Sequence, residues 1–286
     1  MNFRLPRKFP LLPRKPKTDK SRYGHALIAA GCDRMPGAAL LTARAALVSG
    51  SGLVTLASTT RVTGLAVVKS PELLTLNLAS CAGALRGSAS TAVLRYAASK
   101  GVNAAVIGPG LSVEGGAPYF VRALTQKLDV PFVLDADGLN AFKGCPAELK
   151  RRCAPAVLTP HTREFERLFE ESVPGISSAR VRLVKQLAAT YHIVLVLKGP
   201  RTLVSDGSRV YENRTGGPAM AKGGSGDVLT GMIAAFLAQG LDPFEAAVWA
   251  VTMHGKAGDR AARRSSELSV TASTMIEELP AVFRLA

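Results

Sequence analysis

The chain has 286 residues, of which 47% are hydrophobic, and a formal net charge of +15. This composition allows a large buried core, and it excludes collagen-like and intrinsically disordered chains. The uncharged apolar run Val228–Leu241 is shorter than the roughly 20 residues that a membrane-spanning helix needs. We therefore predict a soluble globular protein with no membrane partner.

The first residues differ from the rest in composition. Residues 1–22 hold eight lysines and arginines against one acidic residue, Asp19, and they are rich in proline. Such a segment buries little apolar surface, so we predict a flexible tail over residues 1–21 and one domain over residues 22–286. The tail lacks the features of a signal peptide, and the four cysteines show no C-x-x-C spacing. We expect a cytoplasmic protein without a disulfide framework or a protein-bound metal site.

Beyond the tail, short apolar runs alternate with helical patterns. The predicted strands are His25–Ala30, Leu53–Ala57, Asn103–Ile107, Pro131–Leu134, Ala156–Leu158 and Ile193–Leu197. The predicted helices are Gly37–Val48, Ala117–Lys127, Ser177–Thr190, Asp227–Ala238 and Pro243–Arg260. Continuous apolar runs are typical of strands covered on both faces, so we predict an α/β fold with a mostly parallel central sheet between helix layers. Asp206-Gly207, between two β-rich arms, predicts a hairpin.

Glycine, aspartate, histidine and lysine follow five of the predicted strands. The segments are Gly31–Gly37, GPGL at 108–111, DADGLN at 135–140, TPHTREFE at 159–166 and KGPRT at 198–202. The carboxyl ends of parallel strands share one edge of a sheet, and open α/β sheets bind ligands outside that edge. The sequence therefore predicts a ligand site there.

The segment AKGGSGDVLTGMIAAFLAQG, Ala221–Gly240, leads three glycines and a serine into Asp227 at the start of an apolar helix. Glycines let a backbone approach a ligand closely, so successive N–H groups can bind an anion at the positive end of the helix. Asp227 could be a capping residue, but a cap needs none of the glycines. A phosphate cradle with a general base beside it explains both features. The segment matches neither a Walker A loop nor a dinucleotide-binding fingerprint.

Other side chains near these motifs have more than one interpretation. Lys198 and Lys222 are either solvated cations or phosphate ligands. His161 either begins a helix or contacts substrate at a strand end, with Glu164 three residues further on. His254, within an apolar helical pattern, is interpreted as a packed histidine.

Taken together, the motifs resemble those of the ADP/ATP-dependent NAD(P)H-hydrate dehydratases, which form the carboxy-terminal half of YjeF-type bifunctional repair proteins. They occur in the family's order over about residues 22–285, and they are MPGAALLTARAALVSGSGLVTLAS, VIGPGL, FVLDADGLNAF, VLTPH, VLKGPRTLV and NRTGGPAMAKGGSGDVLTG. The resemblance implies a ribokinase-like three-layer α/β/α sandwich. It also implies dehydration of the S epimer of hydrated NADH or NADPH (NADHX or NADPHX): the C6 hydroxyl is phosphorylated by ADP or ATP, and phosphate is then eliminated.

Matched residue by residue, the resemblance also implies site residues. The hydrated nicotinamide nucleotide would contact Ala39, Gly110, His161 and Asp227, with Asp227 as the catalytic base. The adenine nucleotide would contact Lys198, Gly199, Pro200, Arg201, Thr202 and Gly226. Mg²⁺ is expected with the nucleotide, ADP is favoured over ATP, and family analogy suggests a homotetramer.

Three features depart from the family pattern. Thr162-Arg163 stands where Pro-Gly is common after the histidine, and Gly217 stands where Asn is usual. No room precedes residue 22 for the companion epimerase domain, so a stand-alone dehydratase is expected.

Two alternatives remain open. A ribokinase-like kinase of a small alcohol, such as a hydroxyethylthiazole or hydroxymethylpyrimidine, shares the Gly-x-Gly-Asp logic and would leave a stable phosphorylated product. A basic nucleic-acid binder would leave the strand-end motifs unexplained, so no nucleic-acid partner is expected.

Overall fold

The computed structural model describes residues 3, 5, 9–10, 14 and 16–285, and its centre is a nine-stranded sheet with the order β11-β10-β9-β8-β7-β6-β1-β2-β3. Strands β9 to β3 in this order are parallel, whereas β10 pairs antiparallel with both β9 and β11. The strands are β1 (His25–Ala29), β2 (Leu53–Ser58), β3 (Leu74–Asn77), β6 (Ala104–Ile107), β7 (Phe132–Leu134), β8 (Ala156–Leu158), β9 (Val194–Leu197), β10 (Leu203–Ser205) and β11 (Val210–Glu212). A small separate hairpin pairs β4 (Ser80–Cys81) with β5 (Ala84–Leu85).

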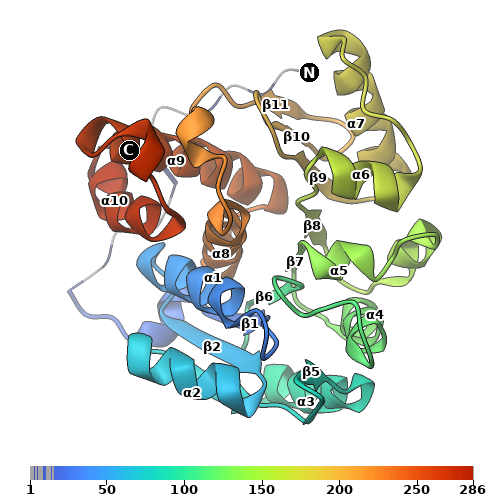
Figure 1. The fold of residues 1–286 in the computed structure, drawn as a ribbon, viewed down its shortest axis with the longest axis vertical. Helices are drawn as coiled ribbons and strands as arrows, with labels where there is room; N and C mark the ends of the chain where they lie inside the picture. Colours follow the sequence, from blue (N-terminus) through green and yellow to red (C-terminus); the bar gives the residue numbers. More distant parts are fainter. Residues whose placement is uncertain (1–2, 4, 6–8, 11–13, 15, 286) are drawn as a thin grey trace.

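Helices cover both faces of the sheet (Figure 1). One layer contains α1 (Pro36–Val48), α2 (Thr60–Lys69), α8 (Ser225–Ala238), α9 (Pro243–Arg264) and α10 (Ala272–Arg284). The other contains α3 (Ser90–Ser99), α4 (Ala117–Lys127), α5 (Asp137–Asn140), α6 (Thr162–Phe169) and α7 (Ser177–Tyr191). Short 3₁₀ helices are η1 (Lys20–Tyr23), η2 (Gly87–Ala89), η3 (Pro146–Arg151), η4 (Pro218–Met220) and η5 (Glu267–Ser269).

Alternate residues of each strand enter different cores. Ala26 and Ile28 of β1 pack with the α8 layer, whereas Leu27 and Ala29 pack with the α4 layer. This two-sided burial explains why the strands have continuous apolar sequences. The predicted three-layer α/β/α sandwich with a mostly parallel sheet is confirmed.

The strand and hairpin predictions agree with the structure to within one residue at each strand end. The β10–β11 hairpin turns at Asp206-Gly207, where Gly207 has φ +94° and Asp206 accepts hydrogen bonds from two backbone N–H groups. The predicted strands and helices do not include β3, β4, β5, α2, α3, α5, α6 or α10. Strand β3 is a mostly exposed edge strand without an apolar run, and Pro280 lies inside α10.

Helix α8 lies at the centre of its layer, against α1 and α9 (Figure 1). Gly231 makes this packing possible, because a Cβ atom there would lie 2.2 Å from the carbonyl oxygen of Thr42. All α8 residues from Val228 to Ala238 are buried. The contact with α1 fixes the amino end of α8 relative to the sheet.

Several described residues of the amino-terminal segment contact the rest of the protein. The backbone N–H of Phe3 donates to the carbonyl oxygen of Val210 at 2.8 Å, and its ring meets that of Phe244 edge-on. Phe9 packs against three aromatic rings at centroid distances of 4.9 to 5.9 Å, those of Phe236, Trp249 and Phe283. Much of the predicted tail lies outside the described residues, so its flexibility stays a prediction.

Within the described part of the chain, none of the helices combines the length and the apolar character needed to cross a membrane.

Candidate active site

A cavity of about 1010 Å³ lies beyond the carboxyl ends of β7, β8 and β9. It is lined by residues after these strands, by the segment from Asn213 to Asp227, and by Val251, His254 and Gly255 of α9. Three of the five predicted strand-end segments therefore meet there, those that follow β7, β8 and β9. This volume is at the upper limit of the range found for small-molecule and cofactor sites.

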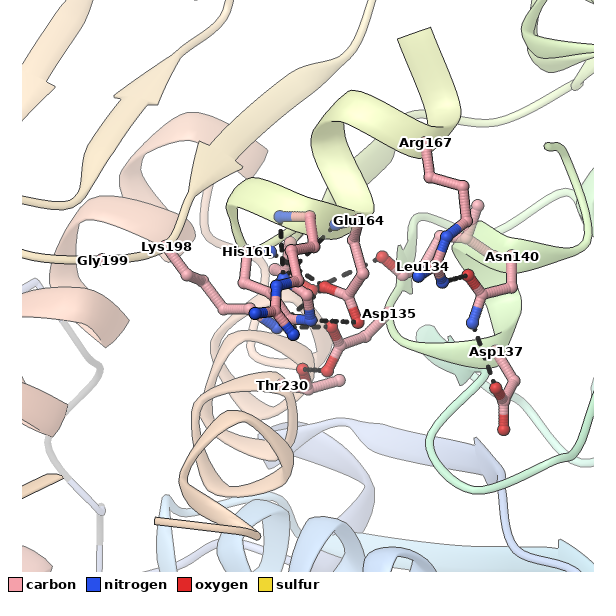
Figure 2. Close-up of polar contacts among 12 residues, drawn as sticks. Leu134, Asp135, Asp137, Asn140, His161, Glu164, Arg167, Lys198, Gly199 and Thr230 are labelled. Atoms are coloured by element: carbon pink, nitrogen blue, oxygen red, sulfur yellow. Dashed lines mark hydrogen bonds and ion pairs between the residues drawn. The ribbon is translucent and has the colours of Figure 1, made fainter. Parts of the chain in front are cut away.

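Lys198 is at the centre of a buried polar network (Figure 2). Its Nζ atom donates to Asp135 Oδ1 at 2.8 Å and lies 3.7 Å from Glu164 Oε2. Thr230 Oγ1 donates to the other oxygen of Asp135 at 2.7 Å. Burial alone would lower the pKa of Lys198, but the nearby carboxylates outweigh it and hold the pKa above its usual value. Lys198 is therefore a fixed cation.

Asp227 lies in the first turn of α8 and does not cap it. The cap residue is Gly224, with φ +90°, and no side chain accepts a hydrogen bond at this cap. Burial raises the pKa of Asp227 to about 7, with a further contribution from the carboxylate of Asp135, partly offset by Lys198. A carboxyl group with a pKa near neutral pH has the property that a general base requires.

His161 caps a helix and also lines the cavity, so the first interpretation is confirmed, whereas its contact with substrate stays a prediction. Its Nδ1 accepts from the backbone N–H groups of Arg163 and Glu164 at 3.1 and 3.3 Å, while Glu164 Oε2 accepts from the N–H of His161. Since Nδ1 is an acceptor, the neutral ring carries its proton on Nε2. The side chain is 50% exposed and lines the cavity, and its Nε2 atom lies 3.4 Å from Glu164 Oε1.

The departure from the family's Pro-Gly at Thr162-Arg163 leaves this cap intact. The cap uses the backbone N–H groups of Arg163 and Glu164 and the side chain of Glu164, and none of these depends on the side chains of Thr162 and Arg163. The altered residues thus change the surface beside His161 while its position is kept.

The segment Lys198–Thr202 forms a tight turn beside the glycine-rich segment Gly223–Gly226, which is the predicted phosphate cradle. Gly199 has φ +144°, and Thr202 Oγ1 donates to the carbonyl oxygen of Gly199 at 2.9 Å. A Cβ atom on Gly226 would lie 3.3 Å from Lys198 Nζ, so this glycine leaves room for the ammonium group. The predicted nucleotide-binding residues therefore all line the same cavity. Arg201 also forms an ion pair with Glu212.

Ala39 and Gly110 lie elsewhere. Ala39 is fully buried in α1, and a Cβ atom on Gly110 would lie 3.0 Å from both the Cβ of Ala38 and the carbonyl oxygen of Met35. Neither residue lines the cavity, so their contact with substrate stays a prediction. Lys222 does line the cavity, and its ammonium donates to the carbonyl oxygen of Leu268.

The predicted site residues omit four polar side chains near the cradle: Asp135, Thr230, Ser225 and His254. Asp135 directly follows a buried strand, and Thr230 is three residues after Asp227 on the same helix. Both positions could have been found from these spacings.

The described residues contain no group of three or more His, Cys, Asp or Glu side chains placed to hold a metal ion. The carboxylates of Asp135 and Glu164 are already engaged by Lys198, Thr230 and backbone N–H. Mg²⁺ in nucleotide enzymes is commonly held by one or two carboxylates together with substrate phosphates. This donor set therefore fits an ion that arrives with the nucleotide.

Comparison with known proteins identifies the family. The family model described as NAD(P)H-hydrate dehydratase matches residues 26–281. The chain belongs to this family. It is 40% identical over 277 residues to the bifunctional NAD(P)H-hydrate repair enzyme Nnr of Moorella thermoacetica, an alignment that covers 96% of this chain and 52% of that protein. The chain thus spans about half the length of the curated relatives that it matches.

Solved structures give the same family relationship. The ADP/ATP-dependent NAD(P)H-hydrate dehydratase from Bacillus subtilis, co-crystallized with ATP/Mg²⁺, is 32% identical with a TM-score of 0.78, covering 96% of this chain and 95% of that one. A hydroxyethylthiazole kinase from Pyrococcus horikoshii is 18% identical with a TM-score of 0.62, covering 93% and 89%. The second likeness shows a shared fold alone.

Proposed function

We propose that this NAD(P)H-hydrate dehydratase family member converts the S epimer of hydrated NADH or NADPH back to NAD(P)H and cleaves ADP to AMP and phosphate. The observation that carries the proposal is the Asp227 carboxyl group, with a pKa of about 7, at a glycine-rich helix start beside Lys198. The names of the Moorella and Bacillus relatives support the substrate class and the use of ADP or ATP.

The cradle and Lys198 would hold the phosphates of the nucleotide. Backbone N–H groups of Gly223–Gly226 and the positive end of α8 favour an anion there. Lys198 keeps its charge beside that anion, because Asp135 and Glu164 hold its pKa high. Mg²⁺, when bound with the nucleotide, would neutralise part of the phosphate charge.

Asp227 would take the proton of the C6 hydroxyl group as its oxygen attacks the terminal phosphorus of ADP. The bond between the terminal phosphorus and the oxygen that bridges it to AMP breaks, and AMP leaves with that oxygen, so the phosphoryl group is now on the C6 oxygen. The C6–O bond then breaks to release phosphate, and loss of the C5 proton restores the ring double bond. Hydrated NADH and ADP thereby give NADH, AMP and phosphate.

We further propose the assignment of ligands within the site. ADP would contact Lys198–Thr202 and Gly226 on the cavity wall. The hydrate would reach Asp227 from the side of His161, with Ala39 and Gly110 contributing through the amino end of α1. We also propose that the protein is a cytoplasmic homotetramer. Analytical ultracentrifugation of the purified protein would test whether it forms a tetramer.

Incubation with NADHX and either ADP or ATP tests the proposal. Recovery of absorbance at 340 nm that needs nucleotide, faster with ADP, is the expected result. Nucleotide consumption with hydroxyethylthiazole or hydroxymethylpyrimidine but no 340 nm signal would instead indicate a small-alcohol kinase. No nucleotide-dependent turnover with any of these substrates would refute both enzyme assignments.

A further inference from the structure

His254 is a buried polar group that the proposed reaction does not use. It lies within α9, lines the cavity, and has only 8% of its surface exposed. Its Nε2 atom is 3.4 Å from the hydroxyl oxygen of Ser225. Burial lowers the pKa of His254 to about 4, partly offset by a contact of the ring with the Ser225 backbone, so the ring is neutral at physiological pH. A neutral imidazole has one N–H group and one acceptor nitrogen.

Ser225 is the polar member of the glycine-rich cradle. It is the first residue of α8, it lies between Gly224 and Gly226, and it lines the same cavity as Asp227. Its side chain does not cap the helix. A hydroxyl group has a single proton, which Ser225 can donate either to His254 or to a ligand in the cavity, but not to both.

The polarity of the cradle decides between these two arrangements. If His254 Nε2 accepted the proton, Ser225 would present only lone pairs to an anion held by the cradle, which is unfavourable. If Nε2–H donates to Ser225 Oγ, the hydroxyl proton is free for a phosphate oxygen. Hydrogen bonds to charged groups are among the stronger ones in proteins.

We propose that Ser225 is a phosphate-binding residue of the nucleotide site and that His254 is a positioning residue, whose Nε2–H orients the Ser225 hydroxyl toward the phosphate. This inference rests on the proposed function, since it requires a phosphate in the cradle. It assigns roles to two side chains at positions 225 and 254 for which the resemblance to the dehydratases implied none.

Calorimetric titration of the intact protein with ADP and with adenosine tests this chain of hydrogen bonds from His254 through Ser225 to the phosphate, which we call the relay. Ser225→Ala should raise the Kd for ADP roughly tenfold or more, as expected for loss of a hydrogen bond to a charged group. His254→Phe, which keeps the size but removes the donor, should raise it several-fold. Adenosine has no phosphate, so its affinity should change little in either variant.

The double variant separates the relay from simple packing. In the Ser225→Ala background, His254→Phe should cause no further loss of ADP affinity, because the group on which it acts is gone. His254→Gln retains a donor and should bind ADP almost as the wild type does. Thr252→Val, on the same helix but outside the cavity lining, is the matched control and should leave the Kd unchanged.

The outcomes are distinguishable. Equal losses from His254→Phe with and without the Ser225 hydroxyl, or equal losses for ADP and adenosine, would overturn the relay while leaving the proposed function. Absence of ADP binding to the wild type would overturn the relay and the proposed function together.

Discussion

The two ends of helix α8 have opposite chemistry. At the amino end, a glycine caps the helix without side-chain help, and the partly buried carboxyl group of Asp227 lies near Asp135 and Lys198. At the carboxyl end, Phe236 is fully buried and packs against Phe9 and Phe283. The same helix therefore holds a carboxyl group whose ionised form is disfavoured at one end, and apolar packing at the other.

This difference indicates that the amino end is built for chemistry at a cost in stability. Folding raises the pKa of Asp227 from 3.8 to about 7. Stability linked to its protonated form is fully present below about pH 4 and is lost as the pH rises through about 7. Above that pH, the ionised carboxylate costs the folded state on the order of a few kcal/mol.

The substitution Asp227→Asn gives the largest expected effect, and it acts on the amino end alone. It removes the base, so turnover should fall by about 10² to 10⁴-fold. ADP affinity should hold or rise slightly, because a negative charge beside the phosphates is lost. Assays at 340 nm and calorimetric titration measure the two quantities.

The same variant should also be at least as stable as the wild type, and more stable at pH 8, because it removes a buried charge that folding disfavours. Thermal unfolding at pH 5 and pH 8 measures this. Retention of more than about a tenth of wild-type turnover would place the base elsewhere. An unfolded variant would mean that the carboxylate has a structural role.

A smaller effect is expected at His161. Asparagine is a good helix cap but has no group equivalent to Nε2–H, so His161→Asn should keep the α6 cap and weaken binding of the hydrate by roughly tenfold. The Kd for ADP should stay near that of the wild type. Equal losses for hydrate and ADP would contradict the separation of the two ligands, and His161→Ala, which also loses the cap, is the comparison.

The smallest expected effect concerns the carboxyl end of α8. Phe9→Ala should lower the melting temperature by a few degrees, because it removes packing against Phe236, Trp249 and Phe283. Turnover per folded molecule should be unchanged. Phe9→Leu, which keeps most of the buried area, is the control.

Deletion of residues 1–18 tests the predicted flexible tail directly. Because the deletion removes Phe9 together with Phe3, the melting temperature should fall at least as far as in Phe9→Ala. An unchanged melting temperature would contradict this and would support a tail without packing energy.

The sequence was informative where neighbours along the chain determine the feature. Continuous apolar runs predicted the strands that flank the cavity, and the glycine-rich segment predicted the start of a helix with Asp227 in its first turn. The Asp135–Lys198 pair, however, joins loops after β7 and β9, which become neighbours only through the sheet order. The contacts of Phe9 were not predictable either, since an aromatic residue in a basic, proline-rich segment has no periodicity to show what it packs against.

The dependence of kcat/KM for the hydrate on pH, measured with the wild-type protein at 340 nm, tests the central claim about Asp227 most directly. The carboxylate form is the base, and its pKa is raised to about 7. The rate should therefore be level in the alkaline range, bend near pH 7, and fall by about tenfold for each pH unit below the bend. A rate that is flat between pH 5.5 and pH 8, or that rises as the pH falls, would contradict Asp227 as the base.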